Sequence, residues 1–228
     1  LPAAWLLTLA AGLAAQAQPQ APSLYQARCR TTSGAFTLTL HRDWAPRAAD
    51  RFYQLLQAHY YQGNAFYRVV PGFVVQWGLS PTPALSQAWR KRTLPDDPVR
   101  HGNLAGTISF AAAGRNTRTT EVFINLADRP QLDKLGFAPF GEVTEGLATV
   151  RGLEGGYGDG PPRGHGPDPR LIMTQGADYL TRNFPRLDVL YGCDVAPLAP
   201  WCISPVVLML VFGLVAGSFL GLAADRLP

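Results

Sequence analysis

Alternation of apolar and polar positions predicts β-strands over most of the chain between residues 23 and 195. The segments SLYQARCRTT and AFTLTLH alternate with a period of two on either side of a Ser-Gly pair, which is typical of a β-hairpin. NAFYRVVPGFVVQWG (residues 64–78) predicts two strands joined by a Pro-Gly bend. Further segments rich in β-branched and aromatic residues predict additional strands: TISFA, TEVFINLA, FAPFGEVTE and RLDVLYGCDV.

A helical period replaces this alternation in DWAPRAADRFYQLLQAHYY. There the apolar residues Ala49, Phe52, Leu55 and Leu56 lie on one helix face, and Pro46 suits a first helical turn. The shorter segments GLATVRGLE and ADYLTRNF predict one or two helical turns each. The chain therefore has one long predicted helix and at most two short ones.

Two segments punctuated by proline or glycine, residues 79–103 and 155–170, predict long irregular loops. Many strands, few helices and long connections favour a mainly β fold in which a closed barrel carries capping helices. The predicted folded domain covers residues 23–192, which is enough chain to bury one core.

The apolar segment LPAAWLLTLAAGLAAQA (residues 1–17) ends in a small-x-small pattern, Ala15-Gln16-Ala17, and predicts a secretory signal peptide. A short N-terminal anchor or a buried helix is the alternative. With a cleaved signal, the domain lies on the non-cytosolic side, in the secretory pathway or at another extracytoplasmic membrane.

A second apolar segment, PVVLMLVFGLVAGSFLGLAA, contains no charged residue. About 20 helical residues span roughly 30 Å, the thickness of a bilayer's hydrocarbon core. We expect a single transmembrane helix at residues 203–224, joined to the domain by a linker at 193–202; a buried globular helix is the alternative. Because Gly213, Gly217 and Gly221 recur every four residues, they favour close association with a second helix.

Composition excludes several classes of function. The formal net charge of the 228 residues is +4, without a stripe of Lys or Arg, so we expect no nucleic acid partner. We find no metal-ligand spacing, no nucleophile motif and no cofactor signature, and predict neither a metal nor a cofactor. Of the three cysteines, Cys29 and Cys193 lie in strand-like segments near the two ends of the domain and make a better pair than either with Cys202; burial without a bridge remains an alternative.

Arg68 is unusual because it lies in an apolar predicted strand, on the same face as Phe66 and Val70. A guanidinium stays charged at all ordinary pH values, so it does not suit proton transfer. It suits polarisation of a neutral ligand that develops a lone pair. The alternative is a strand residue whose stem packs on the sheet while its head reaches water.

Three ordered blocks carry a resemblance to a known family. FYRVVPGFVVQWG resembles the signature of cyclophilin-type peptidyl-prolyl isomerases, GTISFAAAGRNTRTTEVFINLA is similar to their second signature, and LDKLGFAPFGEVTEG to their third; APRAADRF resembles their first helix. The resemblance runs from about residue 24 to residue 190. It implies an eight-stranded antiparallel barrel capped by two helices, with a site for proline-containing polypeptides on its outer face.

The resemblance also implies roles for individual residues. Arg68 matches the catalytic arginine, and Gln76 matches the glutamine that holds substrate and arginine. The residues that match substrate-binding positions are Phe73, Val74, Ala112, Glu121, Phe123, Leu132 and Phe137.

Three of these positions depart from the family. Val74 replaces a methionine, and Ala112 replaces an asparagine that acts through its backbone carbonyl. Glu121 replaces a glutamine, and we expect its carboxylate to pair with Arg68 and weaken the arginine's pull on the prolyl nitrogen. The sequence therefore predicts an extracytoplasmic prolyl isomerase of reduced activity. The alternative is a membrane-tethered proline-peptide binding module with little or no turnover.

Overall fold

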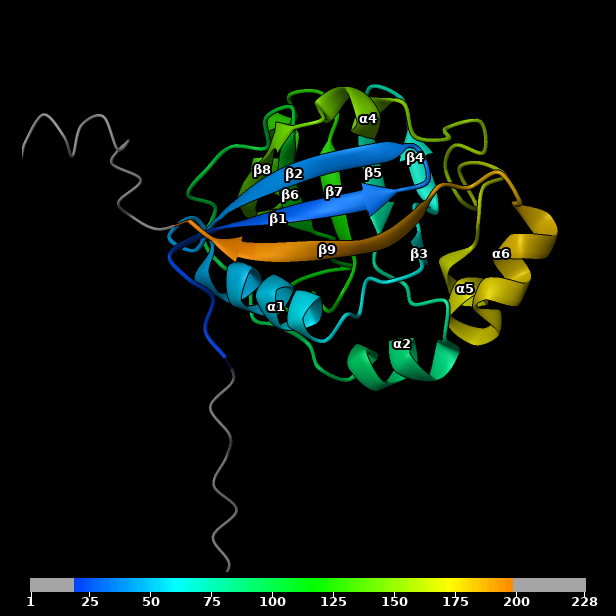
Figure 1. The fold of residues 1–228 in the computed structure, drawn as a ribbon, viewed down its shortest axis with the longest axis horizontal. Coiled ribbons are helices and arrows are strands. Elements are labelled where there is room, and N and C mark those ends of the chain that lie inside the picture. The colour runs from blue at the N-terminus through cyan, green and yellow to red at the C-terminus, as the bar shows by residue number, and fades with distance from the viewer. Residues whose placement is uncertain (1–18, 199–228) are drawn as a thin grey trace, which may run out of the picture. The chain divides into compact units, whose positions relative to one another are not determined.

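The computed structural model describes residues 19–198, which form one curled sheet of nine strands accompanied by six helices (Figure 1). The strands are β1 Leu24–Thr31, β2 Gly34–His41, β3 Asn64–Ala65, β4 Arg68–Val70, β5 Val74–Trp77, β6 Thr107–Phe110, β7 Val122–Asn125, β8 Pro139–Glu145 and β9 Val189–Pro197. The helices are α1 Pro46–Gln57, α2 Pro83–Arg90, α3 Pro130–Lys134, α4 Leu147–Arg151, α5 Pro169–Gln175 and α6 Ala177–Asn183.

The sheet has the order β3-β9-β1-β2-β8-β6-β7-β5-β4, with antiparallel pairing between consecutive partners such as β1 and β2 or β5 and β7. The mainly β prediction is confirmed, whereas the predicted closed ring of eight strands is not what forms. The sheet stays open between β3 and β4, although these end strands are separated in sequence by only Phe66 and Tyr67. The chain changes partner there, because β3 pairs with β9 and β4 pairs with β5.

The predicted N-terminal hairpin and long helix are both present. In the hairpin, β1 and β2 pair in one continuous register from Leu24 with His41 to Thr31 with Gly34. Helix α1 begins at Pro46, whose fixed φ and missing N–H suit a first turn. The apolar face of α1 is buried, with Phe52 and Leu55 fully inaccessible, and contacts β2 and β8. Burial of each such side chain stabilises the fold by about 1.5–3 kcal/mol.

The prediction of two capping helices underestimates the helical content of the described residues. Helix α2 lies inside the segment 79–103 that was expected to be a loop, and α3 and α5 were also unforeseen. Each of these three helices has a proline in its first turn, so the prolines begin helices here rather than only interrupting them. Helices α2, α5 and α6 gather on one side of the sheet (Figure 1).

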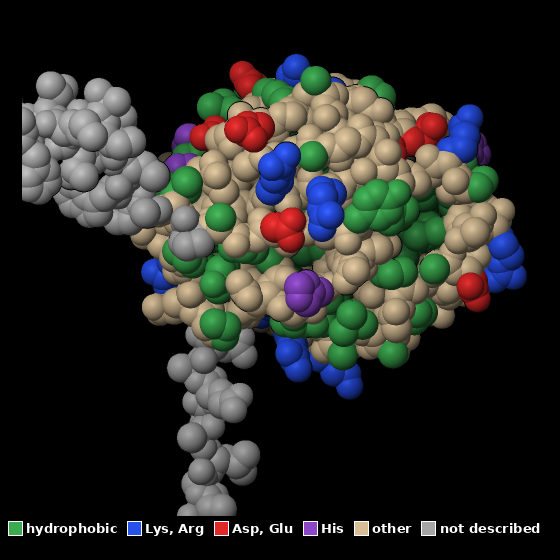
Figure 2. Space-filling model, viewed as in Figure 1, with side chains coloured by type: hydrophobic (Ala, Val, Ile, Leu, Met, Phe, Trp, Pro, Cys, Tyr) green, Lys and Arg blue, Asp and Glu red, His purple; other side chains and the backbone are tan. Residues whose placement is uncertain are grey.

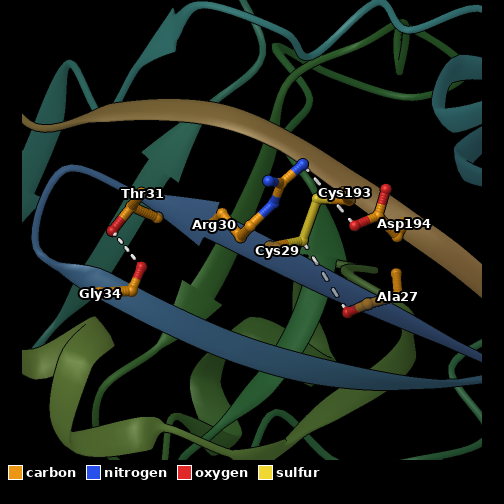
Figure 3. The surroundings of a disulfide bond; sticks show 7 residues. All are labelled: Ala27, Cys29, Arg30, Thr31, Gly34, Cys193 and Asp194. Carbon is orange, nitrogen blue, oxygen red and sulfur yellow. Dashed lines mark hydrogen bonds and ion pairs between the residues drawn. A yellow bond between two sulfur atoms is a disulfide. The ribbon is translucent and has the colours of Figure 1, made fainter.

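A disulfide bond joins Cys29 in β1 to Cys193 in β9, as Figure 3 shows, which confirms the preferred pairing. Cys29 is fully buried. Beside the bond, Arg30 and Asp194 form an exposed ion pair between the same two strands, 3.7 Å between nitrogen and oxygen. The bond therefore connects two neighbouring strands that are 164 residues apart in sequence.

The predicted signal peptide at residues 1–17 and the predicted membrane helix at 203–224 lie outside the described residues, as does Cys202. Within residues 19–198, we find no helix long and apolar enough to cross a membrane. On the face shown in Figure 2, acidic and basic side chains are interspersed with apolar ones and form no stripe of one sign.

Candidate active site

Three neighbouring strands bring the candidate catalytic and binding side chains together. In the register of β4, β5 and β7, Arg68 lies opposite Gln76, and Gln76 lies opposite Phe123. Directly opposed residues in antiparallel strands project on the same face of the sheet. The three side chains therefore form a row across the sheet, and the tight turn between β4 and β5 places Phe73 next to it.

An apolar cavity adjoins this row, with a volume of about 520 Å³. A small cluster of buried side chains, Val74, Phe123 and Leu132, lines it, and Phe137 packs edge-on against Phe123 with 5.6 Å between ring centroids. Eight of the nine predicted site residues line this cavity: Arg68, Phe73, Val74, Gln76, Ala112, Phe123, Leu132 and Phe137. The cavity also receives Arg163, to which the sequence analysis gave no role.

The guanidinium of Arg68 is held on three sides and is only 19% exposed. Its Nε and Nη2 donate to the two carboxylate oxygens of Asp159, at 2.8 and 3.1 Å, and its Nη1 donates to Oε1 of Gln76 at 3.0 Å. The Phe73 ring lies against the guanidinium, 5.4 Å from Cζ to the ring centroid. These hydrogen bonds lower the pKa of Asp159 below its ordinary value.

Glu121 does not pair with Arg68 in the described structure, so that part of the sequence prediction is wrong. Its carboxylate accepts hydrogen bonds from the Tyr67 hydroxyl and from Nε2 of Gln76, which also donates to the Tyr67 oxygen at 2.6 Å. Glu121 lines a second cavity that shares Gln76, Ala111 and Ala112 with the first. Gln76 thus separates the two charged groups: its amide nitrogen faces Glu121 and its amide oxygen faces Arg68.

Burial of the Glu121 carboxyl raises its pKa above the ordinary value of 4.5. A raised pKa in the folded state means that the folded protein binds more protons than the unfolded chain between the two pKa values, so the free energy of unfolding falls as pH rises above about 4.5. Glu121→Gln removes this titration. We therefore expect the free energy of unfolding of the variant, relative to the unsubstituted protein, to increase from about pH 4 to pH 7.

Urea unfolding at several pH values measures this difference. We expect turnover of the Glu121→Gln variant to stay within about threefold of the unsubstituted protein, because no Glu121 atom bonds to Arg68. A stability difference that does not change with pH would contradict a desolvated carboxyl at this position.

Two contributors to the site escaped the sequence analysis. Tyr67 lies at the break between β3 and β4, where strand alternation no longer tells which way a side chain points. Asp159 lies in the glycine-rich segment, 91 residues from Arg68, and nothing in the local pattern connects the two. A carboxylate within a run of glycines was a visible signal, but it carries no information about its partner.

The comparisons with known proteins agree with this architecture. The family model "Cyclophilin type peptidyl-prolyl cis-trans isomerase/CLD" matches residues 27–171. A peptidyl-prolyl cis-trans isomerase of Synechococcus elongatus is 35% identical over 133 residues, which cover 58% of this chain and 90% of that protein. Peptidyl-prolyl cis-trans isomerase ppi1 of Schizosaccharomyces pombe is 34% identical over 125 residues, 54% of this chain and 80% of that protein.

Two further comparisons define the extent of the likeness. Peptidyl-prolyl cis-trans isomerase-like 2 of Gibberella zeae is 34% identical over 144 residues, but the match covers only 24% of that longer protein. The crystal structure of a cyclophilin type isomerase from Cryptosporidium parvum superimposes with a TM-score of 0.56 at 19% identity, over 77% of this chain and 99% of that one, which establishes the fold.

The curled sheet and the arginine beside an apolar cavity thus define a prolyl isomerase class of protein. The chain belongs to the cyclophilin-type peptidyl-prolyl cis-trans isomerase family.

Proposed function

We propose that this protein isomerises X-Pro bonds of polypeptides outside the cytosol, at the cavity beside Arg68. The observation that carries the proposal is the position of the guanidinium, which adjoins an apolar cavity and is fixed by Asp159 and Gln76. A guanidinium has five N–H donors, and these partners occupy three of them. Two donors therefore remain for a substrate.

The chemistry requires no covalent intermediate. Rotation about an X-Pro bond must break amide resonance over a barrier of about 18–20 kcal/mol, and it takes tens to hundreds of seconds without a catalyst. In the twisted state the prolyl nitrogen regains its lone pair. An N–H of Arg68 donates to that lone pair, and since the planar ground states offer no such acceptor, the bond stabilises the transition state selectively.

The apolar cavity holds the proline ring while the preceding carbonyl turns. The apolar side chains that line the cavity are Val74, Phe123, Leu132 and Phe137. We assign to the backbone carbonyl of Ala112, on the cavity's rim, a hydrogen bond to the peptide. A structure of the Cryptosporidium parvum protein was determined in the presence of the dipeptide Ala-Pro, and its likeness to this chain (TM-score 0.54, 20% identity) makes a proline peptide a suitable first probe.

The disulfide supports placement of the domain outside the cytosol. Such bonds form and persist in oxidising compartments, and this one joins strands at the two ends of the domain. In this proposal, a signal peptide at residues 1–17 directs export and a helix at 203–224 anchors the chain. Mass spectrometry of the protein purified from membranes tests both segments, with Gln18 expected as its first residue and residues 203–224 still present.

A protease-coupled proline-peptide assay on the full chain in mild detergent tests the activity. Turnover must exceed the uncatalysed rate and must depend on Arg68, so an Arg68→Ala variant is assayed in parallel. Equal rates for the two proteins would overturn the enzymatic proposal. Peptide binding at the cavity without any turnover would favour the binding-module alternative instead.

Phe123→Ala is expected to raise KM by about tenfold with a smaller change in kcat. The substitution removes a ring that is 5% exposed and packs against Phe137, so the proline loses apolar contact in ground and transition state alike. Kinetics over a range of peptide concentrations measure the two constants. Leu171→Ala, at an exposed apolar residue in α5, is the control and should change neither. A fall confined to kcat would contradict a binding role for Phe123.

A further inference from the structure

Asp159 is the one carboxylate within the described residues that pairs with Arg68, and the sequence pattern gave it no role. It lies in the glycine-rich loop, residues 155–168, between α4 and α5. The loop contributes two charged side chains to the candidate site, Asp159 on the guanidinium and Arg163 at the cavity. Both side chains therefore come from one loop that lies outside the sheet.

The glycine-rich loop is attached to the strand that carries Arg68. Gly158 forms an isolated antiparallel bridge with Val69, on the side of β4 that faces away from β5. Gly158 has a φ of +66°, a conformation that glycine adopts without the strain of other residues. The bridge fixes the backbone immediately before Asp159 next to the residue that follows Arg68.

The same loop folds back on Asp159 and closes around it. The N–H of Gly166 donates to the backbone carbonyl of Asp159 at 2.9 Å, and the N–H of Gly160 donates to its side-chain Oδ1, also at 2.9 Å. A Cβ on Gly164 would lie 2.3 Å from the Asp159 carbonyl oxygen, so only glycine fits there. The glycines thus allow a compact turn, and this turn holds the Asp159 carboxylate in a defined position.

The geometry points to Asp159 as a positioning residue for Arg68, an inference that rests on the proposed isomerase function. A bidentate contact to Nε and Nη2 fixes the plane of the guanidinium. Without it, the long side chain keeps only one hydrogen bond, to Gln76, and the contact with the Phe73 ring. An arginine side chain is long and has many rotamers, and a catalytic donor acts only within a narrow range of orientation.

The ion pair also has an effect of the opposite sign, because a neighbouring carboxylate offsets part of the guanidinium's charge. Two observations limit that effect. The pair is partly exposed, 19% for Arg68 and 26% for Asp159, so solvent screens the interaction. The carboxylate also occupies the Nε edge and leaves one hydrogen on each terminal nitrogen, where a substrate can accept it. We therefore expect the orientation of the guanidinium to outweigh the loss of charge, so that the net effect of Asp159 is to raise turnover.

Steady-state kinetics of the full chain with a proline peptide test the inference. We expect Asp159→Ala to lower kcat by about tenfold and to change KM less than about twofold, because it disturbs the donor and leaves the apolar walls intact. Asp159→Glu restores a bidentate acceptor and is expected to recover at least about a third of kcat. Asp194→Ala, which removes a carboxylate from an exposed ion pair in β9, is the matched control and should change neither constant.

Asp159→Asn guards against the case in which Asp159→Ala does not fold. It keeps the size of the side chain and one acceptor oxygen, and is expected to fall between the Ala variant and the unsubstituted protein. An unchanged or increased kcat in the folded Ala or Asn variant would overturn the inference, as would a rise in KM that matches the fall in kcat. If the turnover of the unsubstituted protein does not exceed that of Arg68→Ala, the proposed function fails. If it does exceed it, and the Asp159 variants turn over as fast as the unsubstituted protein, only this inference fails.

Discussion

Arg68→Ala is expected to lower kcat/KM for a proline peptide by about 10²–10³-fold, the usual loss on removal of one preorganised donor from a transition state. In the proposed mechanism, the substitution removes the group that donates to the prolyl nitrogen when that nitrogen becomes pyramidal. The apolar cavity, formed mainly by Val74, Phe123 and Leu132, stays in place. We therefore expect the affinity for the peptide to change by less than about threefold.

The protease-coupled assay measures turnover, and peptide titration followed by NMR measures affinity. Arg68→Lys is the informative companion, because it keeps the positive charge and loses the planar fork that engages Asp159 and Gln76 together. We expect it to remain at least tenfold below the unsubstituted protein. Full activity in the Lys variant would mean that charge alone suffices, and would contradict a role for the orientation of the guanidinium.

Loss of the disulfide bond is expected to have the largest effect on stability. Cys29 and Cys193 are 164 residues apart, so their bond restricts nearly the whole unfolded domain. The chain-entropy relation gives about 5 kcal/mol for a loop of this length, and measured losses on removal of native disulfides are commonly about 2–5 kcal/mol. Cys193→Ala is expected to lower the free energy of unfolding by about 3–5 kcal/mol, since it also leaves the buried Cys29 without its partner.

Urea unfolding under non-reducing conditions measures this loss. Cys202→Ala removes the third cysteine and leaves the Cys29–Cys193 bond intact, so we expect it to change the free energy of unfolding by less than about 0.5 kcal/mol. Addition of a reductant should lower the stability of the unsubstituted protein and leave that of Cys193→Ala unchanged. If the unsubstituted protein and Cys193→Ala had equal free energies of unfolding before reduction, this would contradict a stabilising disulfide.

The strongly periodic elements could be predicted because each has one buried face. Alternation defined the hairpin of β1 and β2, and the spacing of Phe52, Leu55 and Leu56 defined α1. Helix α2 has no such face, since Ser86 is its one buried residue. Its sequence therefore looks like a proline-rich loop.

The opening of the sheet depends on tertiary structure rather than on local pattern. Residues 64–70 read as one apolar strand, and Phe66 and Tyr67 at its middle are both buried. Nothing in that stretch reveals that β3 pairs with β9 while β4 pairs with β5. The change of partner at these two residues leaves the sheet open, where the sequence predicted a closed ring.

The part of the candidate site that lies on paired strands could be predicted from the sequence. The resemblance placed Arg68, Gln76 and Phe123 at matching positions, and the ladder of β4, β5 and β7 brings them side by side. The sequence predicted the wrong carboxylate as the ion-pair partner of Arg68. Glu121 lies close by in the sheet, whereas Asp159 reaches Arg68 from a loop that is distant in sequence. Loop segments have no periodicity from which such a contact can be inferred.

The bridge between Gly158 and Val69 has a consequence for the exposed edge of the sheet. A strand at the end of a sheet presents unpaired backbone groups that can recruit another extended chain and begin aggregation. β4 is such a strand, and it carries Arg68. Because the chain's own loop pairs with Val69 in the middle of that edge, the edge offers fewer unpaired backbone groups to which another extended chain could add as a strand.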